Sequence, residues 1–267
     1  MKNFLLIIIL LTNLIACKAQ DKMKVVYVYD ALCGWCYGFS SVMNQFQVKY
    51  KDELDFEVIS GGMITGDRIG PIVEVASYIG KAYKDVENAT GVKFGDTFLH
   101  RTLAEGEAVF TSIPPAIALS VFKSLSPENS VQFASALQKA IYFNGIEPEN
   151  LDAYGHIASR FGLDGEAFVV KMKDPVYLKF AEEDFNTSAA LGVNGFPSVF
   201  VEYKGRYYKI GSGYLPFSSL ESNFLINNDE ESYSIVWSNR ANWKAILGIS
   251  TGRRIRGEST RSQYNKT

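Results

Sequence analysis

The chain has 267 residues, a formal net charge of −2, 47% hydrophobic residues and 13% aromatic residues. The small net charge gives no electrostatic reason to expect a nucleic-acid partner. The apolar and aromatic content excludes an extensively disordered chain, and the length allows one large domain or two small ones.

The N-terminus resembles an export signal that ends in a lipid-attachment site. Lys2 precedes an apolar run from Phe4 to Ile15. This run is shorter than the roughly 20 residues that span a bilayer, and it fits a signal peptide. It ends in Leu14-Ile15-Ala16-Cys17, which is similar to a bacterial lipobox. We expect residues 1–17 to be a lipoprotein signal with Cys17 as the lipid attachment site. The alternative is an ordinary signal peptide that happens to contain a cysteine.

The next stretch combines a strand, two cysteines and a helix. Lys24–Tyr29 is a Val/Tyr run that favours a strand buried on both faces. Cys33-Gly34-Trp35-Cys36 follows. The apolar residues after it recur at spacings of three and four, which predicts a helix. Leu54–Ile59 alternates apolar with acidic residues and predicts a second strand.

Helical patterns dominate from about residue 67 to residue 191, and strand patterns then return. Ser198–Tyr203 and Arg206–Ile210 flank Lys204-Gly205, which predicts a two-residue hairpin connection. Pro216 is expected to open a last helix that runs to about Ile226.

Three smaller expectations concern the helical region and the C-terminus. Glu182-Glu183-Asp184 is expected to form a solvated helix face, and Tyr142 and Phe143 are expected in the core. Residues 232–267 hold seven Lys and Arg against one acidic residue. This composition predicts a basic, flexible tail, with contact to anionic lipid headgroups as the alternative.

The cysteine pair indicates thiol–disulfide exchange. A cysteine at a helix N-terminus lies near unpaired N–H groups that favour its thiolate. Cys33 occupies this position and is expected to attack, whereas Cys36, one turn into the helix on its apolar face, is expected to resolve the mixed disulfide. Trp35 offers an aromatic surface to a substrate.

Three other uses of the pair fit less well. A structural zinc site needs four ligands, and the sequence has no second CxxC. A c-type haem site needs a histidine after the second cysteine, where this chain has Tyr37. A purely structural disulfide across two residues would be strained. No metal and no organic cofactor is therefore expected.

The order of these elements resembles the thioredoxin fold, and the helical stretch between its halves is similar to that of the DsbA family, in its FrnE-related group. The residues that carry the resemblance are Tyr29 to Gly38 and Gly192 to Pro197. It implies an α/β thioredoxin-like fold with a large all-helical insertion between its two halves. The implied parts are 24–66 with 180–228 as the thioredoxin-like domain, and 67–179 as the insertion.

The resemblance also implies roles for residues near the pair. Pro197 would be a cis-proline beside the CxxC, and Phe196, Pro197 and Trp35 would form the surface on which a substrate docks. One departure is Tyr27, which stands where many thioredoxin-fold enzymes carry a buried acid, six residues before the first cysteine.

Together these features predict a monomeric protein dithiol–disulfide oxidoreductase or isomerase in the bacterial cell envelope. It would be lipid-anchored, face the periplasm, and act on exported proteins with cysteines, with a redox partner protein supplying or taking electrons. Two alternatives stay open: a glutathione-dependent transferase or isomerase of the same fold, and a non-catalytic envelope lipoprotein that binds a ligand or partner.

Overall fold

The structure, a computed structural model, describes residues 22–226. The predicted signal with Cys17, the segment 232–267 and the last two residues of the predicted 180–228 part lie outside the described residues.

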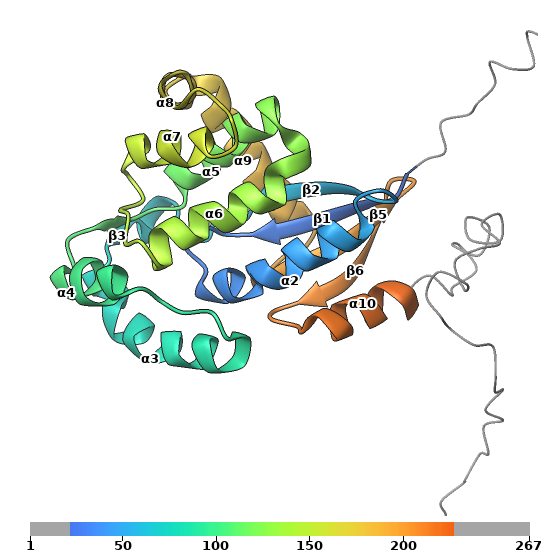
Figure 1. Cartoon of the computed structure of the whole chain (residues 1–267), viewed down its shortest axis with the longest axis horizontal. Helices are drawn as coiled ribbons and strands as arrows, with labels where there is room; N and C mark the ends of the chain where they lie inside the picture. The colour runs from blue at the N-terminus through green and yellow to red at the C-terminus, as the bar shows by residue number, and fades with distance from the viewer. Residues whose placement is uncertain (1–21, 227–267) are drawn as a thin grey trace, which may run out of the picture. The chain divides into compact units, whose positions relative to one another are not determined.

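A four-stranded mixed sheet forms the centre of the described chain (Figure 1). Its strand order is β2-β1-β5-β6, with β1 parallel to β2 and the other neighbouring pairs antiparallel. The parallel pair needs a crossover, and α2 provides it. The elements of this part are β1 (Lys24–Tyr29), α2 (Gly34–Tyr50), β2 (Asp55–Ser60), β5 (Ser198–Tyr203), β6 (Arg206–Ser212) and α10 (Phe217–Ile226).

Strand β1 contributes side chains to the cores on both faces of the sheet, because successive side chains of a strand point to opposite faces. Val26 and Val28 belong to a buried cluster with Phe200. Tyr27 instead packs against Phe39 of α2, with ring centroids 6.0 Å apart. This double burial explains why the strand reads as a continuous apolar run rather than an alternating one.

The region between β2 and β5 is mostly helical, as predicted, and α6 lies along α2. A short antiparallel pair of two-residue strands interrupts it, with Pro71 paired to Val109. The elements are β3 (Gly70–Pro71), α3 (Val73–Thr90), a π-helical turn (Phe98–Thr102), α4 (Leu103–Glu105), β4 (Val109–Phe110), α5 (Ile113–Leu125), α6 (Ser130–Tyr142), α7 (Leu151–Ser159), α8 (Gly165–Met172) and α9 (Pro175–Ala190).

Helix α9 joins the two parts of the fold. It packs on β2 of the sheet and on α5 of the helical region. The boundary expected at residues 179 and 180 falls inside this helix, so α9 belongs to both parts.

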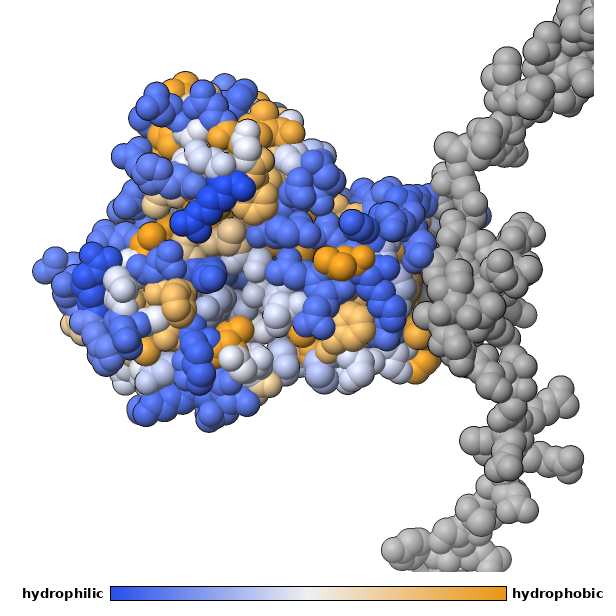
Figure 2. All heavy atoms as spheres, viewed as in Figure 1, coloured by the Kyte–Doolittle hydropathy of each residue, from blue (hydrophilic) through white to orange (hydrophobic). Residues whose placement is uncertain are grey.

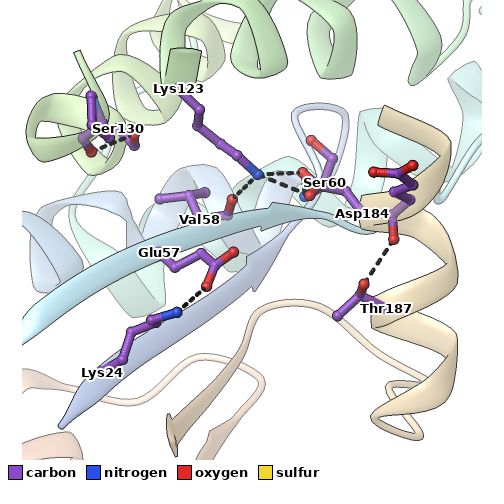
Figure 3. A network of polar contacts seen from close by, with 10 residues as sticks. Lys24, Glu57, Val58, Ser60, Lys123, Ser130, Asp184 and Thr187 are labelled. Carbon is purple, nitrogen blue, oxygen red and sulfur yellow. Dashed lines mark hydrogen bonds and ion pairs between the residues drawn. The ribbon is translucent and has the colours of Figure 1, made fainter. Parts of the chain in front are cut away.

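A partly buried ion pair fixes this junction (Figure 3). Lys123 of α5 extends its ammonium group to Asp184 of α9, with Nζ 2.8 Å and 2.9 Å from the two carboxylate oxygens. The same ammonium donates to the carbonyl oxygen of Val58 at 3.0 Å, and the backbone N–H of Ser60 donates to Asp184. Burial raises the pKa of Asp184, and the charge of Lys123 opposes that rise. Three elements distant in sequence thus meet at one charge pair.

The expectation that Glu182-Glu183-Asp184 is a solvated helix face is wrong for Asp184, which is buried. Ala181, Asp184 and Ser188 share the buried face of α9 at spacings of three and four. The acidic run therefore lies across two faces of the helix. Phe143, expected in the core, is 44% exposed, whereas Tyr142 is buried as expected.

The face seen in Figure 2 has hydrophobic residues scattered among polar ones rather than gathered into a broad apolar area. Isolated apolar side chains of this kind are normal on protein surfaces. Within residues 22–226, no helix has the length and apolar character needed to cross a bilayer.

Replacing Lys123 with Met should strongly destabilise the protein, because the Asp184 carboxylate would stay buried without its counter-ion. We expect a loss of about 3 kcal/mol or more in the free energy of unfolding, measured by urea denaturation. The matched control is Lys179→Met, which breaks an exposed ion pair with Glu183 in α9 and should cost less than about 1 kcal/mol. Equal losses in the two variants would contradict the assigned role of the Lys123–Asp184 pair.

Candidate functional site

The site forms where β1 ends and α2 begins. Cys33 is the N-cap residue of α2, with extended backbone angles (φ −92°, ψ 111°), and its carbonyl oxygen accepts the first helical hydrogen bond, from Tyr37. Its sulfur therefore lies where unpaired helical N–H groups favour a negative charge. Cys33 is buried but keeps 8% of its surface exposed.

Cys36 lies one turn further along α2 and is fully buried. Burial raises the pKa of Cys36 well above its ordinary value, and the neighbouring Cys33 sulfur and the charge of Asp30 raise it further. Both cysteines of the pair are free thiols in this structure. Both cysteines are buried, and Cys33 is the more accessible of the two, as expected.

The turn before β5 comes from the far end of the sequence and meets Cys33. The Phe196–Pro197 peptide bond is cis, as predicted. The Cys33 thiol donates a hydrogen bond to the carbonyl oxygen of Phe196, with the sulfur and the oxygen 3.6 Å apart. The main chain at the cis-proline therefore borders the thiol expected to react.

The Phe196 side chain turns away from this contact. It is half-buried and packs against the cluster of Val26 and Val28. It also lies so close to Gly61 that a Cβ atom there would be 2.1 Å from the ring, which explains the glycine. Phe196 thus gives its carbonyl oxygen to the site and its ring to the core, and its role in binding substrate stays a prediction.

A buried carboxylate organises the loop before Cys33. Asp30 is 1% exposed, and its two oxygens accept three hydrogen bonds. These come from the backbone N–H of Leu32 at 2.9 Å, the backbone N–H of Met63 at 2.8 Å and the hydroxyl of Ser112 at 2.9 Å. Burial raises the pKa of Asp30, while these three donors oppose the rise. The sequence did not predict that Asp30 is buried, nor that Met63 and Ser112 donate hydrogen bonds to it.

Helix α6 of the insertion holds the same loop from the other side. The Gln138 side-chain amide donates to the carbonyl oxygen of Asp30 at 3.3 Å, and the Tyr142 hydroxyl donates to the carbonyl oxygen of Leu32. Tyr142 also stacks on Tyr37 of α2, with ring centroids 5.5 Å apart. A residue predicted only as core is therefore part of the frame around the cysteine pair.

An apolar pocket of about 120 Å³ opens beside Cys33. Cys33 and Trp35 line one side of it, and Tyr78 and Ile79 of α3 line the other. Trp35 is half-buried, and its ring lies 6.4 Å from that of Tyr214. Trp35 and Cys33 both line the pocket, as their predicted roles require. Residues of α3 line it too, although the sequence did not connect this helix to the site.

Among residues 22–226, no group of three or more His, Cys, Asp or Glu side chains is arranged to hold a metal ion. Of the predicted site residues, the structure brings together Cys33, Cys36, Trp35, Phe196 and Pro197, whereas Cys17 lies outside the described residues.

No protein-family model matches the sequence, and no curated protein matches it. Similar solved structures do exist. One, from Nitrosomonas europaea, is described as a candidate protein disulfide isomerase. It has a TM-score of 0.68 and 22% identity, and the match covers 82% of this chain and 99% of that one.

Two further structures extend the comparison. The cytosolic disulfide reductase DsbM from Pseudomonas aeruginosa has a TM-score of 0.65 and 24% identity over 77% of this chain and 97% of its own, and it has also been solved with GSH. A probable DsbA oxidoreductase from Streptomyces coelicolor has a TM-score of 0.53 and 17% identity. This match covers 88% of the present chain and 94% of the other. Together with the sheet order and the cis-proline, these likenesses show that the chain has the thioredoxin fold with a helical insertion that DsbA-like proteins share.

Proposed function

We propose that the chain is a thiol–disulfide oxidoreductase that acts on cysteines of exported proteins. The observation that carries the proposal is the arrangement of Cys33. It caps α2, its thiol contacts the carbonyl oxygen before the cis-proline, and Cys36 lies buried one turn below. The fold shared with DsbM and the DsbA oxidoreductase supports the same chemistry.

The chemistry proceeds in two exchanges. The Cys33 thiolate attacks a substrate disulfide, forms a mixed disulfide and releases the first substrate thiolate. Cys36 then attacks the Cys33 sulfur, closes the Cys33–Cys36 disulfide and releases the second. The same steps in reverse insert a disulfide into a substrate. Burial of Cys36 sets the order, because a substrate disulfide can reach the Cys33 sulfur but not the sulfur beneath it.

The substrate is expected to lie between the cis-proline turn and α3. The Phe196–Pro197 main chain borders Cys33 on one side, where an extended substrate chain can align. The apolar pocket with Trp35 and Tyr78 lies on the other, and it can take an apolar side chain near the substrate cysteine. This surface selects for cysteines in extended, apolar segments, which unfolded proteins expose.

The N-terminal sequence supports a proposal for where this activity takes place. We infer that Cys17 carries lipid and anchors a monomeric enzyme to the bacterial envelope, facing the periplasm, with a partner protein exchanging its electrons. The lipobox-like Leu14-Ile15-Ala16-Cys17 supports this placement. DsbM, with the same fold, is cytosolic, so the fold by itself does not fix the compartment.

A glutathione-dependent activity is the second candidate, because DsbM has been solved with GSH and the pocket beside Cys33 is small. The two candidates differ in their substrates. Turnover of a glutathione mixed disulfide, or glutathione conjugation, without turnover of protein disulfides would favour this second candidate.

Replacing Cys33 with Ser should abolish catalysed reduction of insulin by dithiothreitol, measured as precipitation of the insulin B chain. The variant loses the sulfur that a substrate reaches. Cys36→Ser is the matched control, because it keeps the attacking thiol and should accumulate a mixed disulfide seen by mass spectrometry. Wild-type protein that shows no turnover would support a non-catalytic binding module instead.

Replacing Tyr78 with Ser should weaken binding of apolar protein substrates and leave the cysteine chemistry intact. Tyr78 is 69% exposed, so the change removes a wall of the pocket without opening the core. The loss of part of one aromatic contact, about 1 kcal/mol, should raise KM about fivefold.

The matched control for this change is Val170→Ser on α8, which also replaces an exposed apolar helix residue, 67% exposed. KM should not change in that variant. An unchanged KM in Tyr78→Ser would remove α3 from the substrate surface.

Replacing Cys17 with Ser should move the protein from the membrane fraction to the soluble fraction, measured by fractionation and immunoblotting in a bacterial host. The serine oxygen cannot form the thioether that lipid attachment requires. The matched control is Thr12→Ser, which introduces a serine into the same apolar run but leaves Cys17 in place, and this variant should stay membrane-bound. Membrane retention of Cys17→Ser would contradict lipid anchoring.

A further inference from the structure

Strand β1 buries a tyrosine hydroxyl on the face of the sheet that packs against α2. Tyr27 is 2% exposed, and its hydroxyl makes no hydrogen bond within the described part of the chain. Buried polar groups without a partner are few in native proteins, and each calls for an explanation. Phenylalanine would fill the same space without that cost, so packing alone does not account for the hydroxyl.

The Tyr27 ring packs against Phe39, which lies one turn after Cys36 on the buried side of α2. Burial raises the pKa of Tyr27 well above its ordinary value, and the charge on Cys36 has the largest effect of any neighbouring group, ahead of Tyr29 and Cys33. Tyr27 therefore keeps its proton and presents a fixed O–H group at the cysteine pair.

Cys36 has little stabilisation for a negative charge when it reacts. A backbone hydrogen bond with Asp30 lowers the pKa of Cys36, but burial and the charge of the Asp30 carboxylate raise it. Cys36 is fully buried and close to the buried carboxylate of Asp30. The thiol form needs no partner, but the thiolate that attacks the mixed disulfide is costly in such surroundings unless a donor faces it. An orphaned hydroxyl next to this sulfur is a donor of the required kind.

We propose that the Tyr27 hydroxyl donates a hydrogen bond to the Cys36 sulfur as it becomes the attacking thiolate. This inference rests on the proposed exchange at Cys33 and Cys36. Cys36 gives its proton to solvent and attacks the Cys33 sulfur. The Cys33–Cys36 bond forms as the bond from Cys33 to the substrate sulfur breaks, and the substrate leaves as a thiolate that takes up a proton. Tyr27 keeps its own proton throughout.

The test separates the two exchanges by stopped flow with the aromatic disulfide dithiobis(nitrobenzoate). Reduced protein releases one coloured thiolate when Cys33 attacks and a second when Cys36 resolves the mixed disulfide. In Tyr27→Phe the first release should keep its rate and the second should slow about tenfold, which corresponds to about 1.4 kcal/mol. The pH profile of the second release should also move to higher pH, which a purely structural role would not cause.

Tyr29→Phe is the matched control. Tyr29 lies two residues along the same strand, is equally buried, and also has a hydroxyl without a hydrogen bond among the described residues. Among neighbouring groups, Asp30 rather than Cys36 has the largest effect on its pKa. Both releases should keep their wild-type rates in this variant, and Cys36→Ser should show only the first.

The outcomes separate this inference from the proposed function. Wild-type protein that shows no second release would overturn the dithiol mechanism itself. Normal wild-type kinetics with an unchanged second release in Tyr27→Phe would overturn only the role of Tyr27, as would equal slowing in Tyr29→Phe. An unchanged first release shows that each variant is folded around Cys33.

Discussion

The cysteine pair depends on one buried charge, the carboxylate of Asp30. Removing an ion from water is costly unless hydrogen bonds replace its hydration, and three donors do so here. One donor lies in the loop itself, one follows β2, and one precedes α5. Satisfying a single carboxylate therefore brings together the two parallel strands and the insertion, and it fixes the residues that lead into Cys33.

This constraint makes the insertion part of the site rather than an addition to it. Ser112, Gln138 and Tyr142 all come from the insertion, and all three bind the Asp30 to Leu32 loop. Helix α3, also in the insertion, forms the far wall of the pocket beside Cys33. The Lys123–Asp184 pair secures the same insertion against β2 and α9. The two polar anchors together set the position of the helices around the pair.

The sequence predicted the parts of the fold that local pattern determines. The buried face of α2 and the positions of the four long strands along the chain followed from periodicity. The Lys204-Gly205 connection has the positive φ angles, 52° and 75°, of the predicted two-residue turn. The cis Phe196–Pro197 bond came from the family resemblance, because most X–Pro bonds are trans and no local pattern marks the exception.

Contacts between distant segments could not be predicted in the same way. Nothing in the sequence marked Asp30 as buried, and Asp184 was expected to be one of three solvated acids, because a single sequence does not show which polar side chain meets a buried partner. For Asp184 a signal was present: its spacing from Ala181 and Ser188 places it on the inner face of α9. Asp30 offered no such signal, since its partners Met63 and Ser112 lie 33 and 82 residues away.

The buried carboxylate that orders the site also opposes the second step of its chemistry. A negative charge at Asp30 disfavours another at Cys36, and burial acts in the same direction. Cys33 instead caps α2 at its N-terminus and is the more accessible of the two cysteines. The position of Cys33 therefore favours the first exchange, whereas the second exchange requires a hydrogen-bond donor to the buried Cys36 sulfur. Tyr27 meets that need without adding charge, whereas a carboxylate at the same position would place a second buried anion beside Cys36.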